Sequence, residues 1–187
     1  GDQPAVTRND IQMAELCREF IEQDEPFFLY WCSCNPHRAG MLKDHPLRPN
    51  SFGNPSQDFP DDKEEIYDPA EIIVPPFLND TPEVRAELSQ YYQAISRLDR
   101  GINRLMQILQ DSGKYDDTVV IYISDNGAAF PEAKTTLYEP GMNLPLIVKS
   151  PLHEKCGGIC NGLVTWADLA PTILDFAGAE VDESAFQ

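Results

Sequence analysis

The chain has 187 residues, of which 42% are hydrophobic and 10% aromatic, enough for the core of one ordinary domain and too apolar for disorder throughout. Its 14 Lys and Arg against 31 Asp and Glu give a formal net charge of −17 at pH 7. That charge repels phosphates at long range and argues against nucleic acid or an anionic membrane as a partner. No apolar run approaches the roughly 20 residues of a membrane span. We therefore expect one acidic domain over residues 1–187.

A helix and a strand are the first elements predicted. Apolar residues at helical spacing over residues 6–23 predict an amphipathic helix, which Pro26 ends. The apolar, aromatic-rich run at residues 27–32 predicts a buried strand of a parallel sheet. The run stops at Asn35-Pro36-His37-Arg38, so His37 lies just beyond the C-terminal end of that strand.

Residues 39–80 are rich in proline and acidic residues and cannot be regular structure throughout. In a compact domain, such a stretch is usually a functional loop or a mobile segment. A small positive cluster begins beside it, and it is either a solvated loop or a surface that attracts an anionic substrate: Arg38, Lys43, His45 and Arg48.

The clearest predicted helix begins at Asp80, which is a good cap, with Glu83 at the capping-box position. Apolar residues then keep a helical rhythm as far as Gly113, a typical stop. Asn79-Asp80-Thr81 also matches the N-glycosylation pattern, and of the two interpretations we favour the helix start.

Two more strands and a short helix complete the pattern. Buried strands are predicted at residues 119–123 and 144–148, and Asp168 caps a last helix over residues 169–177, closed by Gly178. Strands alternating with helices predict an α/β fold with a mostly parallel sheet flanked by helices. Ligands of such sheets gather beyond the C-terminal ends of the strands.

Four chemistry-bearing residues follow these strands. Asp125 and Asn126 place a carboxylate and an amide oxygen side by side, which suits Ca²⁺ or Mg²⁺, although Asp-Asn-Gly is also good turn chemistry. His37 has an imidazole able to donate a proton or bind an anion, or it is simply solvated. Lys134, in the loop after Asn126, either holds an anionic substrate or is an ordinary exposed lysine.

Cys34 raises a separate question, because Cys34-Asn35-Pro36-His37-Arg38 matches C-x-P-x-R, the minimal signal for converting cysteine to formylglycine. Such a nucleophile is expected where a helix N-terminus faces the anion, whereas this motif trails a strand. We therefore disfavour formylglycine at Cys34. The five cysteines are an odd number and cannot all pair within the chain.

Several segments, in order, resemble the sulfatases of the alkaline-phosphatase superfamily. The resemblance covers nearly the whole chain from Glu25 to Gly178, and residues 67–77 are most similar to the heparan N-sulfatase (sulfamidase) branch. Motifs in matching order are more specific than any single motif. The segments that carry the resemblance are residues 26–30 with 35–38, 91–102, 116–127, 138–141 with 144–148, and 168–174.

This resemblance implies a partial alkaline-phosphatase-like fold and hydrolysis of sulfate esters or N-sulfates, with glycosaminoglycan sugars as the favoured substrates. By position, Asp125 and Asn126 match ligands of the catalytic Ca²⁺. His37 matches a histidine that contacts the sulfate and protonates the leaving atom, and Lys134 matches the basic residue that holds the sulfate oxygens. Arg38 is counted with the substrate-binding residues.

The resemblance also identifies the chain as the middle portion of a longer sulfatase. In the family, the formylglycine and the first acidic metal ligands lie well upstream of the strand that ends in Pro36-His37-Arg38. The expected partners are therefore the rest of the sulfatase and a sulfated carbohydrate, and the expected location is secreted, periplasmic or lysosomal. Alone, the chain is expected to be inactive and to bind Ca²⁺ weakly.

Two other functions remain open at this point. A phosphodiesterase or phosphonate hydrolase of the same superfamily would need extra metal ligands, for which His45 and His153 are available but form no recognisable motif. A noncatalytic module that binds sulfated glycans is the other alternative.

Overall fold

The computed structural model describes residues 8–38, 47, 50–152 and 157–180. The chain divides into two compact units, which are described separately. The first unit contains Gly1–Asp116 and Ile123–Leu146, and the second contains Asp117–Tyr122 and Ile147–Gln187. Lys43, His45, Arg48 and His153 lie outside the described residues. The expectation of a single domain over residues 1–187 stays a prediction.

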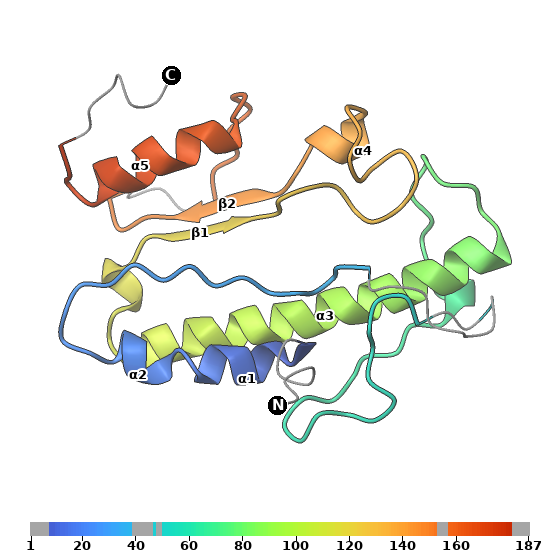
Figure 1. Ribbon diagram of the computed structural model, residues 1–187, viewed down its shortest axis with the longest axis horizontal. Helices are drawn as coiled ribbons and strands as arrows, with labels where there is room; N and C mark the ends of the chain where they lie inside the picture. Colours follow the sequence, from blue (N-terminus) through green and yellow to red (C-terminus); the bar gives the residue numbers. More distant parts are fainter. Residues whose placement is uncertain (1–7, 39–46, 48–49, 153–156, 181–187) are drawn as a thin grey trace. The chain divides into compact units, whose positions relative to one another are not determined.

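The long helix α3 (Pro82–Asp111) is the central element of the first unit (Figure 1). Its N-cap is Thr81, whose hydroxyl accepts a hydrogen bond from the Val84 amide at 3.3 Å. The prediction placed the cap at Asp80, which instead pairs with Arg85 at 2.5 Å. The end is as predicted, because Gly113 follows the helix with φ +72°, a backbone conformation that favours glycine.

The predicted helix over residues 6–23 is two short helices, α1 (Asp10–Glu15) and α2 (Arg18–Ile21). The single-helix prediction is wrong because the amide of Cys17 bonds to the carbonyl of Ala14, three residues back, which interrupts the α-helical ladder. Pro26 does not end the helix either, since α2 stops several residues earlier at Ile21.

Residues 27–32 do not form the buried strand that was predicted. Within the described chain no strand pairs with them, and Phe28 and Tyr30 are 67% and 77% exposed. A strand needs a neighbour to complete its hydrogen-bond ladder, and hydrophobicity alone does not supply one. The segment runs along α3 in the opposite direction, because Phe27 lies near Lys114 while Asn35 lies against Arg97 in the middle of the helix.

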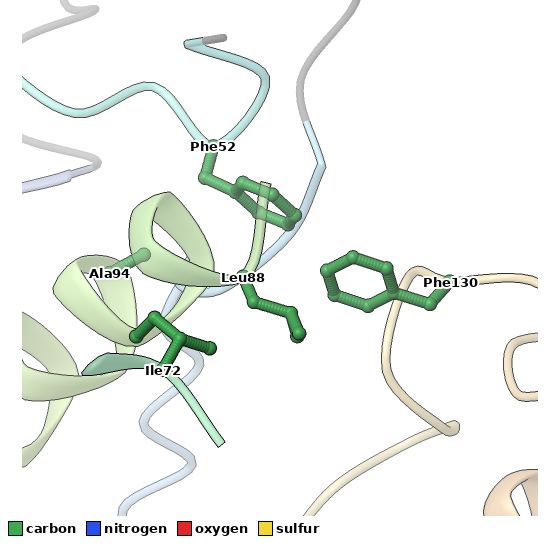
Figure 2. Close-up of a cluster of buried hydrophobic side chains, with 5 residues drawn as sticks. All are labelled: Phe52, Ile72, Leu88, Ala94 and Phe130. Atoms are coloured by element: carbon green, nitrogen blue, oxygen red, sulfur yellow. The ribbon is translucent and has the colours of Figure 1, made fainter. Parts of the chain in front are cut away.

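The hydrophobic core of the first unit is built on α3. Phe52 and Phe130 come from loops far apart in the sequence and pack over Leu88, as Figure 2 shows. Their rings are stacked with centroids 6.0 Å apart, and Tyr91 meets each of them edge-on at 5.4 Å. The core therefore joins residues 50–54 and the loop after Ile123 to the first half of α3.

The described part of the proline- and acid-rich region, residues 50–80, is largely irregular, as predicted. It contains one isolated bridge between Phe59 and Asp62 and a 3-10 turn at Pro69–Glu71. A short helix, α4 (Glu139–Met142), follows later in the unit. Four cysteines in the described ranges are free: Cys17, Cys32, Cys34 and Cys160.

The second unit is built around a two-stranded sheet of β1 (Val120–Ile123) and β2 (Leu146–Lys149), with one end residue of each strand assigned to the first unit. Both strands lie where the sequence predicted them. They run in opposite directions, and the ammonium of Lys149 at the end of β2 bonds to the carbonyl of Thr118 before β1 (Figure 1). The described ranges therefore contain no parallel pair of strands.

The last helix, α5 (Leu169–Phe176), also belongs to the second unit and ends before Gly178, as predicted. Asp168 does not cap it with its side chain; together with Thr165 it forms a capping box around the preceding 3-10 turn. Among the helices of the described ranges, none is both long and apolar enough to cross a bilayer.

Candidate active site

Asn35 anchors the loop at residues 33–38, which carries His37 and Arg38. Its side chain is buried, and its oxygen accepts hydrogen bonds from Arg8 and Arg97, each at 3.2 Å. Its amide nitrogen donates to the carboxylate of Asp10 at 2.7 Å. Both ends of one short polar side chain are thus satisfied, which fixes the start of the loop.

Arg97 connects this anchor to α3 and is completely buried. Its guanidinium forms an ion pair with Glu64 at 2.7 Å and donates to the side-chain oxygen of Asn54 at 3.1 Å. A buried charge is tolerated only when it is paired and hydrogen-bonded, as it is here. Arg97 therefore holds three loop segments at one point in the middle of α3.

Asp10 completes the buried network at the start of α1. Burial raises the pKa of its carboxyl group, while hydrogen bonds from Asn35 and Ser33 act in the opposite direction. The Ser33 hydroxyl donates to it at 2.6 Å. Gly101 of α3 permits the close approach of Asp10 to this helix, because a Cβ at residue 101 would lie 2.8–2.9 Å from the backbone of Asp10.

His37 lies exposed at the tip of the loop. Its amide donates to the carbonyl of Cys34 at 2.9 Å, and its carbonyl accepts from Arg8 at 3.1 Å. The backbone is therefore held, while no described residue hydrogen-bonds the imidazole. Cys34 itself is exposed in this turn, and the interpretation against formylglycine there stays a prediction.

Asp125 and Asn126 lie in the loop that follows β1, where Asp125 is exposed and Asn126 half-buried. The hydroxyl of Ser124 donates to the carbonyl of Asn126 at 2.9 Å, and the chain bends at residues 125–127. Gly127 is packed tightly, because a Cβ there would overlap the carbonyl of Pro140 and lie 3.2 Å from the carbonyl carbon of Ala133. Since Asn126 precedes Gly127 and Lys134 follows Ala133, the two stretches of backbone lie close together.

Lys134 ends a compact turn at residues 128–134. The carbonyl of Ala128 accepts from the amides of both Phe130 and Lys134, at 2.7 and 3.0 Å. Glu132 and Thr135, on either side of Lys134, have φ of 63° and 61°, a left-handed conformation that costs non-glycine residues about 1 kcal/mol or more. Such strain persists only where the surrounding contacts impose it, which is common in functional loops.

Arg38 and Lys134 line the same pocket, which has a volume of about 610 Å³. Its other lining residues belong to the 128–134 turn or follow it directly: Ala129, Phe130, Pro131 and Thr135. The structure therefore brings together two predicted cations from distant parts of the sequence. His37, Asp125 and Asn126 are not among the residues that line this pocket.

Arg38 is already engaged on every side that the structure describes. It forms an ion pair with Glu87 of α3 at 2.5 Å and donates from Nε to the carbonyl of Ala129 at 3.1 Å. Its guanidinium carbon lies 4.9 Å from the ring centroid of Phe52 and 5.5 Å from that of Phe130. The charge of Arg38 is thus balanced by Glu87, whereas no carboxylate in the described ranges forms an ion pair with Lys134, the other cation of the pocket lining.

The oxygen atoms of Asp125 and Asn126 have the chemistry of calcium ligands, since Ca²⁺ prefers carboxylate and amide oxygens. They fit such an ion only in part, because Ca²⁺ takes about six to eight oxygen ligands. No group of three or more His, Cys, Asp or Glu side chains suited to a metal occurs in the ranges that the structure describes. The remaining ligands of a calcium site would have to come from elsewhere in the protein.

Sequence reasoning did not find Glu87, Asn35, Arg97 or Phe52 as parts of this region. Glu87 and Arg97 lie within the predicted helix that ends at Gly113, and charge patterning gives no indication of a partner many residues away. Asn35 was only part of a motif.

A family model described as Sulfatase matches residues 3–179 of the chain. The human N-sulphoglucosamine sulphohydrolase is 40% identical over 178 residues, which cover 91% of this chain and 36% of the human protein. The N-acetylglucosamine-6-O-sulfatase of Bacteroides thetaiotaomicron is 35% identical over 98 residues, which cover 50% of this chain and 18% of that protein.

One solved structure, that of Ps i-CgsB in complex with k-i-k-neocarrahexaose, resembles the chain with a TM-score of 0.61 and 26% sequence identity. The match covers 96% of this chain and 35% of that one. The chain thus spans about a third of the length of the human protein and of this structural neighbour.

Proposed function

The chain belongs to the sulfatase family and has a partial α/β fold of that family, and on this premise we propose that the protein containing it hydrolyses sulfate esters or sulfamates of sugars. The observation that carries the proposal is the 40% identity to N-sulphoglucosamine sulphohydrolase over 91% of the chain. Because the other curated relative named above acts on a sulfated N-acetylglucosamine, a sulfated glucosamine is the favoured substrate.

The pocket at Lys134 supports an anionic substrate. Its ammonium group is a point charge next to apolar side chains, where water screens a charge less than in bulk solvent. The chain as a whole carries a net charge of −17, so an anion is attracted only where local cations dominate. We assign Lys134 to the non-bridging oxygens of the sulfate group, on which negative charge is concentrated in the transition state.

His37 is assigned the role of general acid. Cleavage of the bond from sulfur to oxygen or nitrogen places charge on the leaving atom, and an imidazole protonates such an atom efficiently near neutral pH. Both the backbone amide and the backbone carbonyl of His37 are hydrogen-bonded. This supports the role, because proton transfer depends on placing the acid within hydrogen-bond reach.

Asp125 and Asn126 are assigned as two of the ligands of a calcium ion, whose charge would stabilise the sulfate oxygens. The nucleophile expected for the family is a formylglycine outside this chain. The calcium assignment rests on the family resemblance and on the oxygen chemistry of the two side chains. The formylglycine assignment rests on the family resemblance. A secreted, periplasmic or lysosomal location is proposed on the same basis.

The proposed function is tested with the purified full-length protein that contains this chain. We expect release of inorganic sulfate from N-sulfoglucosamine or from a 6-O-sulfated N-acetylglucosamine, measured by ion chromatography. Lys134→Ala should lower kcat/KM about 100-fold or more, because it removes a charge that faces the transition state. Lys63→Ala, at an exposed lysine outside the pocket lining, is the matched control and should leave turnover unchanged.

Two results would contradict the proposed function. One is release of phosphate from sugar phosphates in place of sulfate, which would support the phosphoryl-transfer alternative. The other is the absence of any turnover in a protein that binds heparin and contains formylglycine, which would support the noncatalytic glycan-binding alternative.

A further inference from the structure

Arg38 connects the loop that carries His37 to the turn that carries Lys134. Its Nε donates to the carbonyl of Ala129, inside the 128–134 turn, while its own backbone continues directly from His37. One side chain therefore links the two candidate catalytic residues through a short covalent and hydrogen-bonded path.

The link is held in place by α3 and the aromatic core. Glu87 of α3 fixes the other end of the guanidinium at 2.5 Å, and the Ser51 hydroxyl is 3.4 Å from the second oxygen of Glu87. The rings of Phe52 and Phe130 pack against the guanidinium, and both rings are buried in the core (Figure 2). A planar guanidinium that is hydrogen-bonded, paired and stacked has little freedom to reorient.

From this arrangement we propose that Arg38 is a positioning residue, which locks the His37 loop and the Lys134 turn at one fixed separation, rather than a residue that binds the substrate directly. The proposal rests on the proposed function for its kinetic consequences, but its geometry does not depend on which anion is bound. Glu87 has the same role as Arg38, because it neutralises and orients the guanidinium.

The two roles of Arg38 predict opposite effects for the mild variant Glu87→Gln. If Arg38 positions the two segments, loss of the ion pair loosens both of them, so kcat falls while KM changes little. If Arg38 binds the substrate, removal of the neighbouring negative charge frees it for an anion, so KM falls and kcat is retained.

The experiment measures steady-state kinetics of the full-length protein with 4-nitrophenyl sulfate for wild type, Glu87→Gln, Arg38→Lys and the double variant. We expect kcat to fall about tenfold or more in each single variant, with KM within about twofold, and the double variant to be no worse than Arg38→Lys because both changes break one unit. Arg18→Lys, in the exposed pair with Glu22, is the matched control and should behave as wild type.

Hydrogen exchange on the same proteins, without substrate, separates this inference from the proposed function. The amides of Phe130 and Lys134, which donate to the carbonyl of Ala128, should exchange faster in Glu87→Gln than in wild type or Arg18→Lys. Unchanged exchange together with a lower KM in Glu87→Gln would overturn the positioning role. If the wild-type protein shows no sulfatase turnover, faster exchange still supports the inference and unchanged exchange overturns it.

Discussion

The side-chain oxygen of Asn35 accepts a hydrogen bond from Nη2 of Arg97 at 3.2 Å, which joins the loop that carries His37 to the middle of α3. The same oxygen accepts from Arg8, and Arg8 also holds the carbonyl of His37. The position of His37 therefore depends on a buried polar network and not on strand pairing, since within the described ranges no strand pairs with residues 27–32.

Asn35→Ala tests this dependence. The change removes one buried hydrogen-bond partner from each of Asp10, Arg8 and Arg97, so we expect a loss of about 2–4 kcal/mol in the free energy of unfolding. Denaturant unfolding of the full-length protein measures it. Asn143→Ala, which removes an exposed hydrogen bond to Glu139, is the control and should change stability by less than about 0.5 kcal/mol. Equal effects of the two changes would contradict the account.

The buried ion pair of Arg97 and Glu64 gives a second prediction. Arg97→Met leaves the buried carboxylate of Glu64 with only its longer ion pair to Arg100, at 3.7 Å, and should cost about 3–5 kcal/mol. Adding Glu64→Gln removes the poorly compensated charge, so the double variant should regain part of that loss. Additive losses in a double-mutant cycle of unfolding measurements would show that the two side chains are not coupled.

The pH dependence of stability should include a contribution from Asp10. Burial raises the pKa of its carboxyl group above the ordinary value of 3.8, so the folded state holds the proton more tightly than the unfolded state. The stability that this provides is complete below pH 3.8 and is lost as the pH rises through the folded pKa.

Asp10→Asn removes this titration. Melting temperatures of the full-length variant and wild type, measured from pH 4 to pH 7, should diverge in favour of the variant as the pH rises. Asp24→Asn, at an exposed carboxylate, is the control. A difference between Asp10→Asn and wild type that is constant with pH would contradict the prediction, whatever the size of the offset.

Gly101→Ala tests the close approach of α1 and α3. A Cβ at this position would overlap the side chain of Asp10 and press on its backbone, so α1 must shift or the variant must unfold more easily. We expect destabilisation of about 2 kcal/mol or more, measured by denaturant unfolding. Gly158→Ala is the matched control, because, apart from its chain neighbours, no atom of the described residues lies within 4 Å of a Cβ placed there. A neutral Gly101→Ala would contradict the described packing.

Sequence reasoning predicted the elements that depend on local signals. Helix α3 and strands β1 and β2 were predicted from the spacing of apolar residues within each segment, which extends over about thirty residues at most. The helix start moved by one residue because Thr81 and Asp80 are both good caps, and Asp80 found a stronger partner in Arg85.

The predictions that failed at the candidate site concern partners distant in sequence. Residues 27–32 have the composition of a strand, but composition does not state which segment completes the ladder. The partners of Arg38 show the same limit, because Glu87 and the carbonyl of Ala129 come from different elements. The proximity of Arg38 and Lys134 in one pocket is likewise a property of the fold.

The proposed function requires that His37, Lys134 and the Asp125-Asn126 pair lie around one anion. A crystal structure of the full-length protein with calcium and bound sulfate tests it most directly. We expect the imidazole of His37 and the ammonium of Lys134 within hydrogen-bond distance of the same sulfate, with oxygens of Asp125 and Asn126 on the calcium ion beside it. A sulfate bound elsewhere, with these four side chains directed into separate regions, would contradict the proposed function.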